Sequence, residues 1–329
     1  MKIYSIYRNM ERYGGAQRVM VDVHNGLKKH NDAKIIGFQK FEELHPKYGI
    51  QREEYVLLRH PWQLNGKTVA VHSRNLIPFF VFIKKILFLN TKIVYVHHNV
   101  YDDFGNYTFF PETIVSTSKR ATKNLVEYFK QDPKKITLIY NGIIDTEKDT
   151  PPIEKKKDKS IKIIYAARVN RVKQQLLIVE NLKNKLDPNV EIHIAGVGDD
   201  FEALKTLCEG LPNFKVLGFV SDIVSLMKEY DYMMLYSIQE ALPLALIEAI
   251  MCSKPLLVND VGGNLEICEP GKNGIELKDW DSLASQLNGL KNISDEEYNA
   301  MAVQSRKIFL QKFQYDEMIK NYRQLIEVI

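Results

Sequence analysis

The chain alternates between short apolar runs and longer segments in which apolar residues recur every three or four positions. In the first half, apolar runs lie at residues 2–7, 34–38, 55–58, 68–72, 93–96, 113–115 and 137–140. Continuous apolar runs of this length are typical of strands buried on both faces of a parallel sheet, and the segments between them have helical periodicity. The pattern therefore predicts an α/β fold in which helices cover a parallel sheet.

The alternation stops at a charged segment that contains prolines, residues 148–160, and then begins again. New apolar runs follow at 161–168, 190–195, 214–220 and 232–236, and the chain ends in three predicted helices. A chain of 329 residues also exceeds the usual size of a single domain. We therefore expect a first domain at residues 1–147, a second at 148–312 and a C-terminal helix at 313–329.

Composition places the chain among ordinary soluble globular proteins, with 45% apolar and 26% charged residues. The three cysteines, Cys208, Cys252 and Cys268, have no metal-binding spacing and predict core residues of a reduced, cytoplasmic protein. The first apolar run begins directly after Met1, so we expect no signal peptide. No apolar run reaches the roughly 18 residues needed to cross a bilayer.

Charge is unevenly distributed along the chain. Residues 1–145 contain 22 Lys and Arg against 13 Asp and Glu, a net charge of +9, whereas the remainder carries −5. A basic first half is compatible with an anionic membrane or an anionic acceptor, and no nucleic-acid-binding module is recognisable. The longest apolar run, residues 76–89, contains two lysines and predicts either a helix packed on the core or one that rests on a membrane surface. Peripheral contact with the inner face of the plasma membrane is therefore one expectation.

The segment from Asp231 to Cys252 combines an apolar run, a polar turn and a helical pattern that Pro243 opens. Glu240 falls in the turn, and Glu248 falls about one and a half turns into the helix. The first amides of a helix have no partner within it and attract phosphate, so carboxylates beside them are suited to accepting hydrogen bonds from sugar hydroxyls. Two solvated acids at a helix end would give the same pattern, and these residues alone leave both interpretations open.

Other candidate residues lie where predicted strands end, which is the edge at which open α/β sheets bind ligands. Gly14 and Gly15 form a strand-to-helix turn that lets the backbone approach a ligand. His72 ends one predicted strand, and His97 and His98 end another. Neighbouring strand residues face opposite sides, so we expect at most one of His97 and His98 to point into a site.

In the second half of the chain, cations and glycines also lie where predicted strands end. Arg168 and Lys173 stand on either side of a short strand-to-helix loop, where two cations could hold a diphosphate. Gly196 and Gly198 end the next strand, but the third glycine of a dinucleotide fingerprint is missing. This pattern argues against a dehydrogenase.

Taken in order, these residues resemble the motifs of retaining glycosyltransferases of the GT-B fold, specifically family 4, the group 1 type that builds bacterial capsule and lipopolysaccharide. The resemblance runs from Gly14 to the last helix. Its motifs are the GGA-x-R loop at Gly14–Arg18, His72, the hinge at Asn141–Asp145, Arg168-x4-Lys173, Gly218–Val220, and Glu240-x7-Glu248 with Pro243, Leu244 and Ala249 inside it. One departure is Gln174, which stands where a glycine commonly follows the lysine and predicts a stiffer loop.

The resemblance implies two Rossmann-like, doubly wound domains that face a central cleft, with the C-terminal helix crossing back to the first domain. The first domain would bind the acceptor. The second would bind a nucleotide diphosphate sugar, with a UDP-sugar as the expected donor. The implied catalytic residues are His72, Arg168, Lys173 and Glu240, and the implied donor-binding residues are Gly14, Gly15, Gly198, Val220, Leu244, Ala245 and Glu248.

The implied reaction moves a hexose or N-acetylhexosamine to a hydroxyl of a glycan or lipid-linked acceptor and retains the anomeric configuration. No carboxylate is placed to act as a covalent nucleophile, and no Asp-x-Asp motif follows a strand, so we expect front-face attack with no metal and no cofactor. Three alternatives stay open: a sugar-nucleotide epimerase, a glycan phosphorylase, and a non-catalytic sugar-nucleotide-binding partner protein. The presence of the whole set of implied catalytic residues argues against the last.

Overall fold

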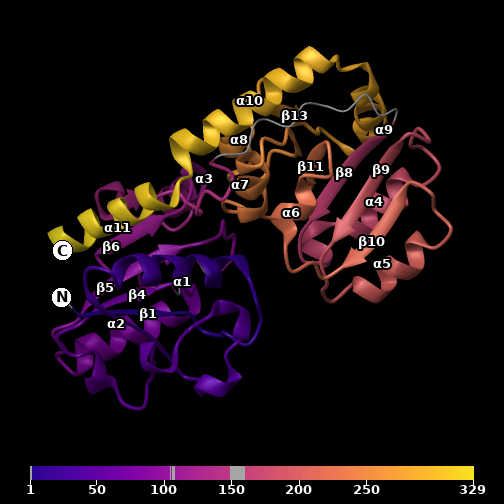
Figure 1. The fold of residues 1–329 in the computed structure, drawn as a ribbon. Coiled ribbons are helices and arrows are strands. Elements are labelled where there is room, and N and C mark those ends of the chain that lie inside the picture. The colour runs from indigo at the N-terminus through magenta and orange to yellow at the C-terminus, as the bar shows by residue number, and fades with distance from the viewer. Residues whose placement is uncertain (1, 104, 106–107, 149–159) are drawn as a thin grey trace. The chain divides into compact units, whose positions relative to one another are not determined.

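The computed structural model describes residues 2–103, 105, 108–148 and 160–329, so most of the predicted linker at 148–160 lies outside the described residues. The chain divides into two compact units, Met1–Gly142 with Tyr315–Ile329, and Ile143–Gln314 (Figure 1). Each unit is built on its own parallel sheet, as the apolar runs predict. In the part of the chain that is described, no helix has the length and apolar character needed to traverse a bilayer.

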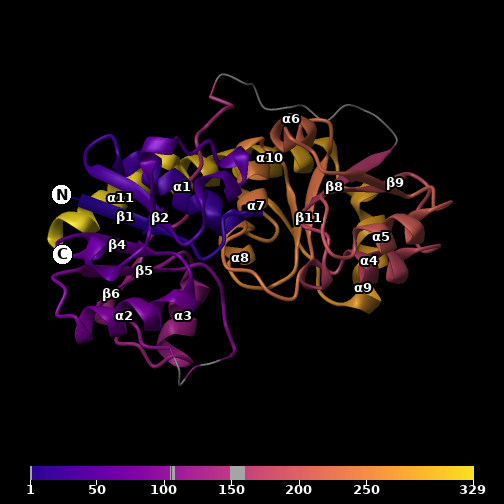
Figure 2. The ribbon, with the colours of Figure 1, turned by 90° about the horizontal axis from the view of Figure 1, so that it is seen from below.

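The first unit contains a seven-stranded parallel sheet in the order β3-β2-β1-β4-β5-β6-β7, so the strand order reverses between β1 and β4. Helices α2 and α3 share one apolar cluster on one face of the sheet, and α1 and α11 lie along the other face (Figure 2). The elements are β1 Lys2–Ile6, α1 Gly15–Leu27, β2 Asp32–Gly37, β3 Tyr55–Leu57, β4 Thr68–Val71, α2 Ile77–Ile86, β5 Lys92–His97, β6 Thr113–Ser116, α3 Lys119–Glu127, β7 Ile136–Leu138 and α11 Tyr315–Val328.

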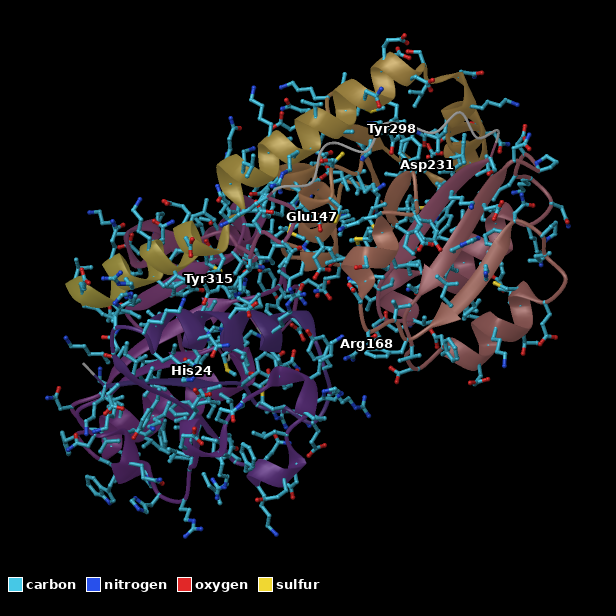
Figure 3. All side chains as sticks on the ribbon, in the orientation of Figure 1. His24, Glu147, Arg168, Asp231, Tyr298 and Tyr315 are labelled. Atoms are coloured by element: carbon cyan, nitrogen blue, oxygen red, sulfur yellow. The ribbon has the colours of Figure 1, made fainter. Side chains whose placement is uncertain are left out.

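The last helix returns to the first unit, which confirms the expected crossing. Tyr315 lies on α11 (Figure 3), and its hydroxyl donates a hydrogen bond of 3.0 Å to the carbonyl oxygen of Asp22 in α1. Gly26 permits the close approach of these helices, because a Cβ at this position would lie 2.4 Å from Cδ1 of Ile319. The C-terminal segment is therefore part of the first unit's packed structure.

The second unit contains a six-stranded parallel sheet in the order β10-β9-β8-β11-β12-β13, which reverses between β8 and β11. Its three cysteines are buried and form no disulfide, as expected. The elements are β8 Ile161–Ala166, α4 Gln175–Leu182, β9 Val190–Ala195, α5 Phe201–Cys208, β10 Phe214–Gly218, α6 Ile223–Met227, β11 Tyr232–Leu235, α7 Leu244–Met251, β12 Leu256–Val258, α8 Asn264–Ile267, β13 Gly274–Glu276, α9 Trp280–Gly289 and α10 Asp295–Lys312.

The boundary between the units falls after Gly142, and not after residue 147 as the composition predicts. The residues that follow Gly142 belong to the second unit because Asp145 accepts two hydrogen bonds, of 2.9 and 2.7 Å, from the guanidinium of Arg306 in α10. A backbone bridge pairs Ile143 with Gln314, so the second unit also extends to Gln314 and not to residue 312. Both predicted boundaries were wrong by a few residues because these contacts join segments far apart in the sequence.

Candidate active site

The second unit brings two loops together at the point where its strand order reverses. Strands β8 and β11 are parallel neighbours, so the loops that follow them leave the same edge of the sheet. The loop after β8 carries Arg168 and a 3₁₀ turn at Arg171–Lys173, and the loop after β11 carries Glu240 shortly before α7. Open α/β sheets bind ligands at a reversal of this kind.

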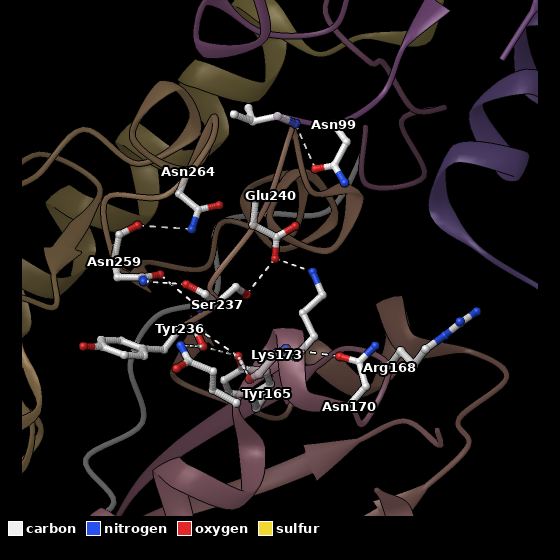
Figure 4. Close-up of polar contacts among 12 residues, drawn as sticks. Asn99, Tyr165, Arg168, Asn170, Lys173, Tyr236, Ser237, Glu240, Asn259 and Asn264 are labelled. Atoms are coloured by element: carbon white, nitrogen blue, oxygen red, sulfur yellow. Dashed lines mark hydrogen bonds and ion pairs between the residues drawn. The ribbon is translucent and has the colours of Figure 1, made fainter. Parts of the chain in front are cut away.

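Lys173 and Glu240 form an ion pair that joins these two loops (Figure 4). The same oxygen of Glu240, Oε1, accepts a hydrogen bond of 2.7 Å from the Ser237 hydroxyl. Glu240 is 7% exposed and the Lys173 side chain 20%, so solvent screens the pair only weakly. The strand-order reversal therefore holds one cation and one carboxylate side by side.

A buried tyrosine in β8 fixes both loops. The Tyr165 hydroxyl lies 2.7 Å from the carbonyl oxygen of Lys173 and 3.0 Å from that of Tyr236, and it accepts a hydrogen bond of 3.0 Å from the Tyr236 amide. Burial raises the pKa of Tyr165 far above its usual value, so the hydroxyl keeps its proton. One side chain thus links β8, the Lys173 turn and the end of β11.

The Lys173 turn has two further local determinants. The Asn170 side chain accepts a hydrogen bond of 3.1 Å from the Lys173 amide and caps the turn. Gln174 has a φ of +56°, in the left-handed region that glycine adopts readily and that costs other residues about 1–2 kcal/mol. Gln174 therefore places backbone strain directly after the lysine, which is more than the stiffening that the sequence predicts.

Helix α7 presents its N-terminus at the same edge of the sheet. Pro243 is the N-cap and makes no side-chain capping hydrogen bond, and the amides of Leu244 and Ala245 have no acceptor within α7. Glu248 lies in the second turn and is 5% exposed. Because Glu240 and Glu248 are both buried, the alternative of two solvated helix-end acids is wrong.

The remaining predicted donor residues lie on the neighbouring loops. Arg168 is exposed and points away from Lys173 and Glu240 (Figure 4), so the structure does not bring it into contact with the ion pair. A Cβ at Gly198 would lie 2.1 Å from the carbonyl oxygen of Val169, so the close packing of the loops after β8 and β9 requires glycine here. Val220 follows β10, the strand at the edge of the sheet.

The first unit repeats this arrangement at its own strand-order reversal. Gly14 and Gly15 follow β1 and open α1, and His72 directly follows the adjacent strand β4. Gly14 has extended backbone angles and supplies no side-chain cap, so the first amides of α1 lack an acceptor within the helix. His72 is 2% exposed, and its amide donates a hydrogen bond of 2.9 Å to the carbonyl oxygen of Ile6 in β1.

His72 is paired with His98, whose role the sequence left open. Their Nδ1 and Nε2 atoms lie 2.8 Å apart and their rings are stacked, whereas His97 faces the other way, toward Tyr95 and Asn124, as strand alternation predicts. Burial lowers the pKa of His72, and it lowers that of His98 to about 3, so both rings are neutral at pH 7. His72 Nε2 is buried and has no hydrogen-bond partner among the described residues, so its hydrogen-bonding capacity is unused within them.

Sequence reasoning missed several residues that shape these sites. Tyr165 lies inside an apolar run, where a tyrosine is indistinguishable from an ordinary core residue. Asn170 carries a signal that could have been used, because an asparagine just before a short helical turn is a typical N-cap. Asn259 carries no such sequence signal, because the two hydrogen bonds that it exchanges with the Ser237 backbone reach across from a distant loop.

Residues 146–308 match the family model described as "Glycosyl transferases group 1". The chain is 23% identical to the uncharacterized glycosyltransferase MJ1069 of Methanocaldococcus jannaschii, over 91% of this chain and 85% of the relative. It is 29% identical to the UDP-Gal:alpha-D-GlcNAc-diphosphoundecaprenol alpha-1,3-galactosyltransferase of Escherichia coli, over 59% of this chain and about half (54%) of the relative. Several other curated relatives are likewise matched over about half of their length.

The fold has a solved counterpart. The crystal structure of Anabaena HepE in complex with UDP-glucose aligns with a TM-score of 0.82 over 100% of both chains, at 18% sequence identity. The two Rossmann-like sheets and this likeness agree with the expected GT-B fold.

Proposed function

We propose that this chain, whose residues 146–308 match the family model of glycosyl transferases group 1, is a retaining glycosyltransferase of family 4. It moves a hexose or N-acetylhexosamine from a UDP-sugar to a hydroxyl of a glycan or lipid-linked acceptor in surface polysaccharide biosynthesis. Relatives named for O-antigen and capsule biosynthesis support the pathway, and the UDP-Gal for which one relative is named and the UDP-glucose in the Anabaena HepE complex support the nucleotide.

The observation that carries this proposal is the ion pair of the half-buried Lys173 with the buried Glu240 at the strand-order reversal of the second unit. A site that held only phosphate would not need a carboxylate, because like charges repel. A site that held only a neutral sugar would not need the lysine or the uncapped amides of α7. The combination fits a sugar diphosphate, with Lys173 and the α7 amides on the diphosphate, Glu240 on the sugar hydroxyls and Glu248 on the ribose.

These groups would accelerate the departure of the nucleotide. Breaking the bond between the sugar and the phosphate leaves negative charge on the phosphate oxygen. A lysine that Glu240 and Tyr165 already hold in place can stabilise that charge without reorganising. Arg168 supplies a second cation at the same edge of the sheet, and we propose that the two cations make a metal unnecessary.

Retention fits the way in which Glu240 is held. Its Oε1 atom is engaged by both Lys173 and Ser237, so the carboxylate is better suited to fixing hydroxyls than to attacking the anomeric carbon. We propose front-face attack in which the leaving phosphate oxygen takes the proton of the acceptor. In the first unit, the neutral His72 would hydrogen-bond the transferred sugar, and Gly14 and Gly15 would let the backbone approach the donor phosphates.

A thermal-shift screen of the full chain against UDP-, GDP-, ADP- and CMP-sugars tests the donor class. A ligand at a hundred times its dissociation constant stabilises the protein that binds it by about 2.7 kcal/mol. We expect this stabilisation for a UDP-sugar, and we expect Glu248→Gln to lose most of it. Glu202→Gln, at the exposed start of α5, removes the same charge and should change nothing.

The products distinguish the remaining alternatives. NMR of the transferred sugar should show the anomeric configuration of the donor, and inversion would contradict the proposed mechanism. Release of sugar phosphate on addition of inorganic phosphate would indicate a phosphorylase, and an isomerised nucleotide sugar would indicate an epimerase. Stabilisation by every nucleotide sugar alike, or by none, would remove the assignment of the donor site.

A further inference from the structure

A pocket of about 550 Å³ lies in the first unit, at the end of its sheet where strands begin. Lys92 opens β5 and Thr113 opens β6, and both residues line the pocket. His72 and Gly15 follow the ends of strands, at the opposite edge. The pocket is therefore separate from the proposed sugar-transfer site, and its volume is within the range of ordinary ligand sites.

The lining of the pocket is amphipathic. Apolar side chains, among them Val81, Phe88 and Ile93, form its walls, and Lys84, Lys85 and Lys92 contribute three cations. Across the described residues, no carboxylate lies within ion-pair distance of any of these three lysines. Glu112, the acidic side chain in the lining, is instead paired with Lys135 at 2.9 Å. The pocket thus combines apolar surface with uncompensated positive charge.

The helix that forms one wall also presents a large apolar surface to solvent. In α2, Ile77 and Phe80 are buried, whereas Phe82 is 64% exposed, and Phe88, just after the helix, is 93% exposed. Phe88 also has a φ of +50°, a left-handed conformation that disfavours a residue with a side chain by about 1–2 kcal/mol. Neither burial nor backbone preference accounts for a phenylalanine at this position, which points to a contact outside the folded chain.

We infer that α2 and this pocket form a docking site for a bilayer that contains anionic phospholipid. The exposed phenylalanines enter the interface, the apolar walls accommodate acyl-chain carbons, and the lysines contact lipid phosphate. A second copy of the chain is a poor occupant, because a symmetric contact places each patch against itself and would oppose the three unpaired lysines of one copy to those of the other. The net charge of +9 on residues 1–145 also favours binding to an anionic surface.

Cosedimentation of the full chain with vesicles tests the charge contribution. We expect salt-sensitive binding to vesicles of phosphatidylcholine and phosphatidylglycerol and little binding to phosphatidylcholine alone. Each lysine near an anionic surface contributes about 1 kcal/mol, so the variant with Lys84→Gln, Lys85→Gln and Lys92→Gln should bind roughly a hundredfold more weakly. The control replaces Lys183, Lys185 and Lys205, exposed residues of the second unit, by Gln and removes the same charge. Equal losses in the two triple variants would overturn the site, since net charge alone would then account for binding.

Phe88→Gly tests the apolar contribution without endangering the fold. Glycine suits the left-handed backbone, so the melting temperature should stay the same or rise, while vesicle affinity falls about tenfold or more through the lost aromatic side chain. Unchanged affinity would overturn the inference, as would displacement by millimolar inorganic phosphate, which would mean a site for a free anion.

A dimer that the Phe82→Ser substitution dissociates would identify the occupant as a second copy instead. Transfer to a short-chain acceptor should be unaffected in all these variants, which separates this inference from the proposed activity.

Discussion

Replacement of Tyr165 by phenylalanine should damage both the stability of the second unit and the position of Lys173, the proposed catalytic lysine. The substitution keeps the ring in the core and removes a single oxygen atom. That oxygen contacts the carbonyl groups of Lys173 and Tyr236 at 2.7 and 3.0 Å and accepts a hydrogen bond from the Tyr236 amide. All three backbone groups belong to the two loops that carry the Lys173–Glu240 pair.

The expected loss of stability follows from these contacts. A buried polar group left without a partner costs about 1–3 kcal/mol. The hydroxyl has one proton to share between two carbonyls, so we count one donated and one accepted bond and expect a loss of about 2–6 kcal/mol. In a domain of this size, each kcal/mol lowers the melting temperature by about 2–4 °C, which gives a shift on the order of 10 °C.

The catalytic consequence is separate from the loss of stability. A displacement of about 1 Å in a positioned charge can lower turnover by roughly a hundredfold, so kcat should fall well below the wild-type value at temperatures where the variant is folded. Donor binding should change less, because Glu248 and the α7 amides do not depend on Tyr165. The measurements are calorimetric melting, donor affinity and kcat on the same preparation.

Tyr232 provides a matched control on the neighbouring strand β11. It is fully buried, but its hydroxyl has no hydrogen-bond partner among the described residues. Tyr232→Phe removes the same atom from the same sheet and should leave the melting temperature unchanged or slightly higher, because an unpaired polar group leaves the core. Equal losses in the two variants would refute the assignment of a special role to the Tyr165 hydroxyl.

Four further predictions concern single positions. Lys173→Ala should lower kcat roughly 10²–10³-fold, the usual effect of losing one charge-stabilising group, and an unchanged kcat would remove it from the mechanism. Gln174→Gly relieves the left-handed backbone and should raise the free energy of unfolding by about 1 kcal/mol in urea titrations, whereas a loss would mean that the side chain matters more than the strain. Gly26→Ala should destabilise the protein despite the better helix propensity of alanine, because Ile319 occupies the space of the new methyl group, and the same substitution should cost less in an Ile319→Ala background, where that space is free. Burial lowers the pKa of His24 to about 4, so below pH 6.5 the unfolded chain takes up a proton that the folded chain does not, and this residue alone should account for about 2 kcal/mol of the stability lost by pH 5; a loss in His24→Gln as large as in the wild type would contradict this.

The strands were largely predictable from the sequence, because each is apolar on both faces and a short continuous apolar run is typical of a strand buried within a parallel sheet. The candidate site residues His72, Lys173 and Glu240 were predictable because they follow predicted strands, and parallel strands bring their carboxyl ends to one edge of the sheet. The unit boundary was not, because the partner that holds Asp145, Arg306, lies 161 positions further along the chain. Spacing within a segment carries no information about contacts of this range.

The two units differ in the charge that they place at their strand-order reversals. The second unit holds a charged pair, whereas the first holds His72 against His98, and burial keeps both rings neutral by lowering their pKa values. An imidazole whose pKa lies well below 7 binds a proton weakly, so His72 is a poor general base for the hydroxyl of an acceptor. The leaving phosphate oxygen, which gains negative charge as the bond to the sugar breaks, is the better proton acceptor. The electrostatics of the first unit therefore support front-face attack independently of the way in which Glu240 is held.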